Sequence, residues 1–129
     1  METDLQRIVS VLAGDIGPRS FREAGALRRA ADFITAELES CGYAPVFQDF
    51  DVDGIPFRNI IAEKKGVTQP DRVMVLGAHY DTVPGTPGAD DNASGVAGML
   101  ELARLSAERD FGITVRFVAF APEEPPFFR

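Results

Sequence analysis

The 129-residue sequence is poor in the two residue types that most often bind transition metals, because it has one cysteine and one histidine. Since Cys41 has no partner within the chain, an internal disulfide and a cysteine-rich zinc site are both excluded. His79 and the carboxylates remain as the candidate metal ligands.

The sequence also lacks a signal peptide, a membrane-length apolar run and an excess of basic residues. Residues 1–5 have neither the basic end nor the apolar stretch of a secretory signal, and no apolar run approaches the roughly 18 residues of a membrane span. We therefore expect a cytoplasmic protein without a membrane partner, while export of a longer parent stays open. The 20 Asp and Glu residues outnumber the 13 Lys and Arg residues. The resulting net charge of −7 argues against nucleic acid as a partner, because phosphate binding needs a basic face.

The 45% of apolar residues suffices for one hydrophobic core, so we treat residues 1–129 as a single domain. Residues 1–43 are predicted to form two amphipathic helices. Each helix begins at a capping box and ends at a glycine. The boxes and stops are Thr3 with Gln6 before Gly14, and Ser20 with Glu23 before Gly42. The longer helix should dock on a sheet through Leu27, Ala31, Ile34 and Leu38.

Residues 44–63 are predicted to form an antiparallel hairpin, in which strands 46–52 and 57–62 meet at Asp53-Gly54. Residues 72–124 are predicted to form a parallel strand–helix–strand unit. Its strands cover 73–78 and 113–120, and its helix runs from about residue 93 to 108. The expected fold class is α/β.

Polar residues follow both parallel strands at the point where each strand ends. His79 leaves the first strand, Glu123 and Glu124 follow the second, and Asp91 precedes the crossover helix, with Asn92 as its N-cap. Because the carboxyl ends of parallel strands lie at one edge of a sheet, we expect these side chains to converge.

Each of these residues has an ordinary alternative explanation when it is taken alone. A histidine at a strand end often only forms hydrogen bonds, Asp90-Asp91-Asn92 is suited to helix capping, and Glu123-Glu124 is typical of a solvated loop. Together, however, imidazole and carboxylates are a typical zinc ligand set, and a cation relieves the repulsion among clustered carboxylates. The combination predicts a metal site for hydrolysis.

Three motifs in this region closely resemble those of the co-catalytic di-zinc aminopeptidases. The family includes bacterial leucyl aminopeptidases, plasma glutamate carboxypeptidase and the glutaminyl cyclases. The motifs are Gly77-Ala78-His79-Tyr80-Asp81-Thr82, then Pro87-Gly88-Ala89-Asp90-Asp91-Asn92-Ala93-Ser94-Gly95, and then Phe117-Val118-Ala119-Phe120 before Glu123-Glu124. The resemblance implies a three-layer α/β/α zinc exopeptidase fold with a mixed, mostly parallel sheet, here reduced to about four strands and three helices. It also implies that the hairpin pairs beside the last strand.

The resemblance implies a role for each clustered residue. His79 and Glu124 would each bind a zinc ion, and Asp91 would bridge the two ions of the complete family site. Asp81 would hold His79 in the correct tautomer. Glu123 would be the general base that accepts a proton from water and donates it to the leaving amine of a peptide substrate.

The sequence departs from the family in one respect, because the family uses a further Asp and a further His that lie later in the chain. Since His79 is the only histidine, the second metal site is incomplete within these 129 residues. We therefore interpret the sequence as the amino-terminal half of a zinc aminopeptidase, expected to bind one zinc ion or none and to be inactive by itself.

Two alternative functions stay open. One is a non-catalytic binding or assembly module on the same scaffold, and the other is glutaminyl cyclisation, which uses one zinc ion. We also expect association between copies, either through the exposed strand edge at 73–78 or through Phe127 and Phe128.

Overall fold

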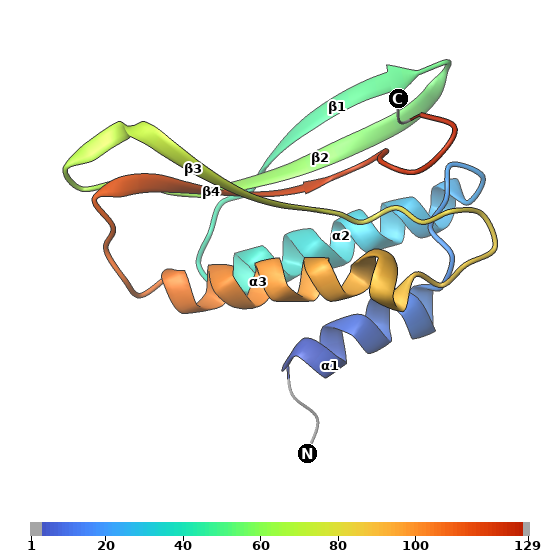
Figure 1. Ribbon diagram of the computed structural model, residues 1–129, viewed down its shortest axis with the longest axis horizontal. Helices are drawn as coiled ribbons and strands as arrows, with labels where there is room; N and C mark the ends of the chain where they lie inside the picture. Colours follow the sequence, from blue (N-terminus) through green and yellow to red (C-terminus); the bar gives the residue numbers. More distant parts are fainter. Residues whose placement is uncertain (1–3, 128–129) are drawn as a thin grey trace.

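The chain forms a mixed four-stranded sheet, and the described helices lie along one face of it (Figure 1). The computed structural model describes residues 4–127. The helical elements are α1 (Asp4–Val9), η1 (Ser10–Ile16), α2 (Ala24–Ser40), η2 (Ala89–Ala93) and α3 (Ser94–Ser106). The strands are β1 (Val46–Val52), β2 (Ile55–Lys64), β3 (Gln69–His79) and β4 (Ile113–Phe120). The expected mixed α/β fold is confirmed, although β3–β4 is the one parallel pair among the three strand pairs described.

The first helical segment is longer than the sequence predicted. It continues through Gly14 into η1, and the chain turns away only at Gly17, where φ is 81°. A glycine adopts this left-handed conformation without the steric penalty that a side chain would bring. The predicted stop at Gly14 is therefore wrong by two residues, and Thr3 of the predicted capping box lies outside the described residues.

The longer helix, α2, docks on the sheet as predicted. The four predicted contact residues, Leu27, Ala31, Ile34 and Leu38, are all buried. The Ser20 N–H donates a hydrogen bond to Glu23 Oε2 at 2.8 Å, as in a capping box, but the helix begins only after this turn. Gly42 follows the helix with a φ of 96°, which confirms the predicted left-handed stop.

The hairpin and the strand order also follow the prediction. Asp53 and Gly54 have φ values of 51° and 81°, so both central residues of the turn are left-handed, as a tight hairpin requires. The order in the sheet is β1-β2-β4-β3, which places the hairpin beside β4 and β3 on the far side. The core lies between β4 and the helices, where Phe117 and Ala119 are completely buried.

The β3–α3–β4 crossover brings two distant chain segments to the same edge of the sheet. His79 pairs in parallel register with Phe120, so β3 and β4 end side by side. The loops that follow these strands therefore start from neighbouring positions. None of the described helices has the length and apolar character needed to cross a bilayer.

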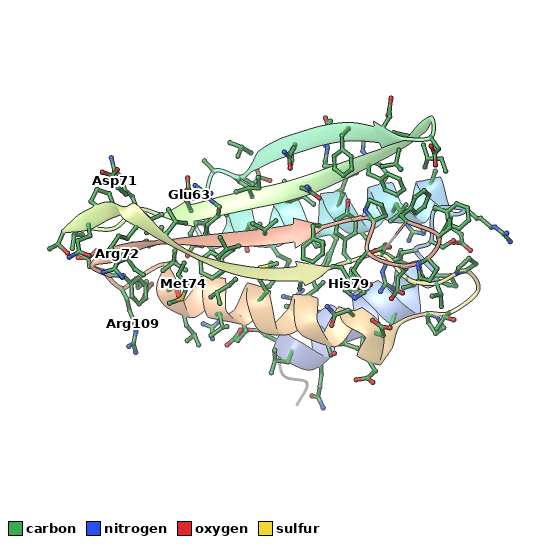
Figure 2. All side chains as sticks on the ribbon, turned by 45° about the horizontal axis from the view of Figure 1, so that its top comes forward. Glu63, Asp71, Arg72, Met74, His79 and Arg109 are labelled. Atoms are coloured by element: carbon green, nitrogen blue, oxygen red, sulfur yellow. The ribbon has the colours of Figure 1, made fainter. Side chains whose placement is uncertain are left out.

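Strand β3 is an edge strand whose apolar residues are exposed. Val73, Met74 and Val75 are 40%, 49% and 57% exposed (Figure 2 labels Met74). Phe127 is instead half-buried, because its ring packs edge-to-face against Phe21 and Phe57, with centroids 5.4 Å away in both cases. Phe128 lies outside the described residues. The edge of β3 is thus the better candidate surface for association.

We propose that copies of the chain associate through this edge, because an apolar strand with free N–H and C=O groups favours pairing with another strand. Val75→Lys should weaken association by about tenfold or more, since pairing would bury a charge. Sedimentation velocity over a range of concentrations measures the effect. Leu5→Lys, which changes an exposed residue on α1, is the matched control. A wild-type chain that stays monomeric throughout the range contradicts the proposal.

Candidate metal centre

The site is organised around His79, the last residue of β3 (Figure 2). Its side chain is 12% exposed, and its two ring nitrogens face different groups. Nδ1 lies 3.3 Å from Asp81 Oδ1, whereas Nε2 lies 3.1 Å from Asp91 Oδ1. Nε2 also lies 3.7 Å from Glu123 Oε2 and 4.0 Å from Glu124 Oε1. The imidazole ring thus has the carboxylate of Asp81 on one side and those of Asp91, Glu123 and Glu124 on the other.

Asp81 is buried, and its carboxylate oxygens accept several hydrogen bonds. The Glu123 N–H donates to both oxygens, at 3.1 and 3.0 Å, and the Glu124 N–H donates to Oδ2 at 3.0 Å. Asp81 is 3% exposed, so its charge is compensated by these donors and by His79 rather than by water. This carboxylate therefore fixes the ring orientation and ties the loop after β3 to the loop after β4.

Asp91 reaches the site from η2, the turn that precedes α3. Gly88 begins this turn in a left-handed conformation with a φ of 61°. Asn92 Oδ1 accepts a hydrogen bond from the Gly95 N–H at 3.2 Å, which provides the capping contact predicted for Asn92. The Asp91 side chain is 71% exposed, so one of its sides faces solvent while the other faces His79.

The two glutamates differ in environment although they are adjacent in sequence. The Glu123 side chain is 46% exposed, and the Glu124 side chain is 11% exposed. Glu123 is therefore open to small molecules from solvent, whereas Glu124 lies deeper against His79 and Asp91.

The close packing of charged groups shifts the pKa values of His79 and Glu124. Burial opposes protonation of His79, but its hydrogen bond to Asp81 and the charges of Asp81 and Glu123 raise its pKa to about 9. Burial and the charges of Asp91 and Glu123 raise the pKa of Glu124. Protons thus reduce the repulsion among the carboxylates when no metal is bound.

The donor set fits a divalent cation. One atom each from His79, Glu123 and Glu124 lie within 4.8 Å of one another, and Asp91 contacts the same ring nitrogen. An imidazole nitrogen with several carboxylate oxygens is a typical ligand set for zinc. The structure thus brings together all five residues that the sequence singled out. Their division into ligands, orienting residue and general base stays a prediction.

One residue near the site was missed by the sequence reasoning. Arg19 is completely buried and hydrogen-bonds to the main chain of both Tyr80 and Gly88, close to His79 and Asp91. Little in the local sequence distinguishes it from an exposed arginine, because its partners at the site are the Tyr80 and Gly88 carbonyl groups, more than 60 residues away. The adjacent Gly17-Pro18 pair marks a turn but does not indicate that the arginine is buried.

We predict that the metal-free protein loses stability as the pH rises from 6.5 to about 9. Because folding raises the pKa of His79 from 6.5 to about 9, its stabilising contribution is complete below 6.5 and is lost as the pH rises through 9. Thermal unfolding in the presence of a chelator measures the decline. His79→Gln should decline less across this window, and an equal decline in both proteins would show that His79 is not responsible.

Two curated relatives share substantial identity with this sequence. The Escherichia coli (strain K12) protein YfbL is 41% identical over 97% of this chain and 41% of its own length. Aminopeptidase YwaD of Bacillus subtilis (strain 168) is 48% identical over 52% of this chain and 15% of its own length. The chain therefore spans less than half the length of either relative.

Solved structures share the fold. A glutaminyl cyclase of Porphyromonas gingivalis superposes with a TM-score of 0.77 at 34% identity, covering 91% of this chain and 44% of its own. BSAP, a zinc aminopeptidase from Bacillus subtilis, superposes with a TM-score of 0.85 at 17% identity, covering 94% of this chain and 61% of its own. The second likeness concerns the fold alone.

The family model that matches the sequence covers the site. Residues 59–127 match Peptidase family M28. This range is more than half of the chain, and it includes β3, β4 and all five clustered side chains. The chain is therefore a member of peptidase family M28, a family of zinc metallopeptidases.

Proposed function

We propose that this site binds zinc for an aminopeptidase, which hydrolyses the amino-terminal peptide bond of a peptide. The observation that carries the proposal is the two-sided environment of His79. Asp81 holds Nδ1, which leaves Nε2 as the ligand atom facing Asp91, Glu123 and Glu124. The aminopeptidase name of YwaD, which is 48% identical over 69 residues, supports this reaction over other hydrolyses.

In this proposal His79, Asp91 and Glu124 hold the metal, and Asp91 is the ligand suited to contact a second ion. When bound, zinc would supply Lewis acidity that activates water and polarises the scissile carbonyl. Glu123 accepts a proton from the attacking water and returns it to the leaving amine. The exposure of Glu123 gives it access to water, and the hydrogen bonds from its main chain to Asp81 fix its position.

Within residues 1–129 we propose that one metal position is complete and the other is not. His79, Asp91 and Glu124 supply three protein ligands, the usual number for a catalytic zinc ion. The family's second position needs an additional Asp and His, and this sequence holds no second histidine. The 129 residues by themselves should therefore bind one zinc ion at most and turn over little substrate.

Glutaminyl cyclisation is a second candidate, favoured by the 34% identity and the TM-score of 0.77 with the Porphyromonas gingivalis enzyme. The two reactions share the need for a metal and a carboxylate but differ in the attacking group, which is water in one and the substrate's own amine in the other. In a preparation with measurable turnover, release from an aminoacyl anilide is compared with cyclisation of an amino-terminal glutamine. The faster reaction identifies the function.

A zinc titration tests whether the cluster is a working site or belongs to a non-catalytic module. We expect His79→Ala to weaken zinc binding by more than the 10- to 100-fold that is typical when only a ligand's hydrogen-bond partner is lost. Isothermal titration calorimetry at fixed pH measures the affinity. Glu39→Gln, which removes an exposed carboxylate on α2, is the control and should bind as the wild type does. Equal, weak binding by wild type and His79→Ala would favour the non-catalytic module.

Glu123→Gln tests the assignment of the general base. The amide keeps the shape of the side chain but cannot accept the proton. In a longer parent enzyme with measurable turnover, the rate should therefore fall by a factor on the order of 100 or more while zinc content stays unchanged. Rate measurements and metal analysis are made on the same preparation. Loss of zinc together with a preserved rate would assign Glu123 to the ligand set instead.

A further inference from the structure

Arg19 is a buried cation at the junction of η1, the loop after β3 and the turn before α3. Its side chain is completely buried, and every hydrogen-bond acceptor recorded for its guanidinium is a main-chain carbonyl. Nε donates to Tyr80 O at 2.8 Å, Nη1 to Leu12 O, Gly17 O and Pro87 O at 2.8, 2.9 and 2.7 Å, and Nη2 to Gly88 O at 3.2 Å. One side chain thus connects three separate segments of the chain.

Two of these segments carry residues of the proposed metal site. Tyr80, whose carbonyl accepts from Nε, lies between His79 and Asp81 in sequence. Gly88, whose carbonyl accepts from Nη2, begins the turn that carries Asp91. The guanidinium therefore fixes the distance between the segment that carries His79 and the turn that carries Asp91. The two side chains approach to 3.1 Å.

The turn held by Arg19 has little freedom to move. The Gly88 carbonyl also accepts the Ala93 N–H at 3.0 Å, which closes the turn. A Cβ at Gly88 would lie 2.4 Å from Thr82 Cγ2 and 2.6 Å from Asp91 O, so the turn packs directly on the loop after β3. The main chain of Arg19 pairs with that loop through its N–H to Thr82 Oγ1 at 2.9 Å and through the Thr82 N–H to Arg19 O at 3.1 Å.

The chemistry of the guanidinium explains why arginine is needed here. No described carboxylate forms a salt bridge with Arg19, so the buried charge depends on the five carbonyl groups. Burial lowers the pKa of Arg19 to about 10, opposed by the charge of Asp81, which leaves it protonated at neutral pH. A guanidinium offers five donors in one plane, whereas an ammonium offers three. Lysine would keep the charge but lose the geometry.

We propose that Arg19 is a positioning residue for the proposed metal site. It holds the loop after β3 and the turn before α3 at the spacing that lets His79 and Asp91 bind the same ion. The proposal rests on the metal-binding function proposed above. It assigns to the segment between η1 and α2 a part in a site whose ligands all lie in residues 79–124.

The experiment compares Arg19→Lys and Arg19→Gln with Leu38→Ala, a core variant at the opposite end of α2. Thermal unfolding gives the overall stability loss of each variant, and calorimetric titration with zinc gives its affinity. Both Arg19 variants should bind zinc about 10- to 100-fold more weakly, the usual range when the support of a metal ligand is removed. Leu38→Ala should lose stability but keep wild-type affinity. Zinc affinities of the Arg19 variants equal to those of Leu38→Ala would overturn the proposal.

Hydrogen exchange in the metal-free protein separates this proposal from the proposed function. The Thr82 and Ala93 amides should exchange faster in the Arg19 variants, while amides of the β2–β4 ladder change only as overall stability does. If the wild type binds no zinc, the proposed function fails, and selective exchange still supports the positioning role. Uniform acceleration overturns it. Should neither Arg19 variant fold, Thr82→Val removes the hydroxyl that accepts the Arg19 N–H and is judged by the same two measurements.

Discussion

The geometry of the site depends on the carboxylate of Asp81. It faces His79 Nδ1 on one side and accepts hydrogen bonds from the Glu123 and Glu124 main chain on the other. A buried carboxylate is stable only when such donors replace water, so burial and hydrogen bonding must occur together. The pairing of β3 with β4 brings these donors within reach. The orientation of the imidazole is therefore a consequence of the sheet register.

The three remaining carboxylates of the site repel one another. Asp91, Glu123 and Glu124 all face one ring nitrogen, and no described Lys or Arg forms an ion pair with any of the three. Protonation of His79 and Glu124 is one way to reduce the repulsion, and a divalent cation is another. A cation would replace a proton on His79 and would also attract the carboxylates that a single proton leaves charged. The arrangement thus couples metal binding to proton release.

Local patterns in the sequence were enough to predict the hairpin, α2, β4 and the convergence of the site. Apolar residues that repeat every second position indicate the buried face of a strand, and those that repeat every 3.6 positions indicate the buried face of a helix. The parallel strand–helix–strand order brings the ends of β3 and β4 to one edge of the sheet. The continuation of the first helix past Gly14 was missed, because the packing that overrides a glycine's weak helix propensity is not written in the local sequence. Phe127 was expected to be available for association, but contacts with Phe21 and Phe57 from distant segments partly bury it.

Arg19 connects two parts of the chain that the sequence suggested were separate, the helices of residues 1–43 and the strand–helix–strand unit of residues 72–124. Residues 59–127 carry every side chain of the cluster, yet the loops that present His79 and Asp91 are joined through a guanidinium from the segment before α2. The site must therefore form together with the packing of η1 rather than within the strand–helix–strand unit alone. The positive charge of Arg19 also compensates part of the negative charge of Asp81. A guanidinium cannot accept lone pairs, so Arg19 cannot take the place of a metal ion at His79 Nε2.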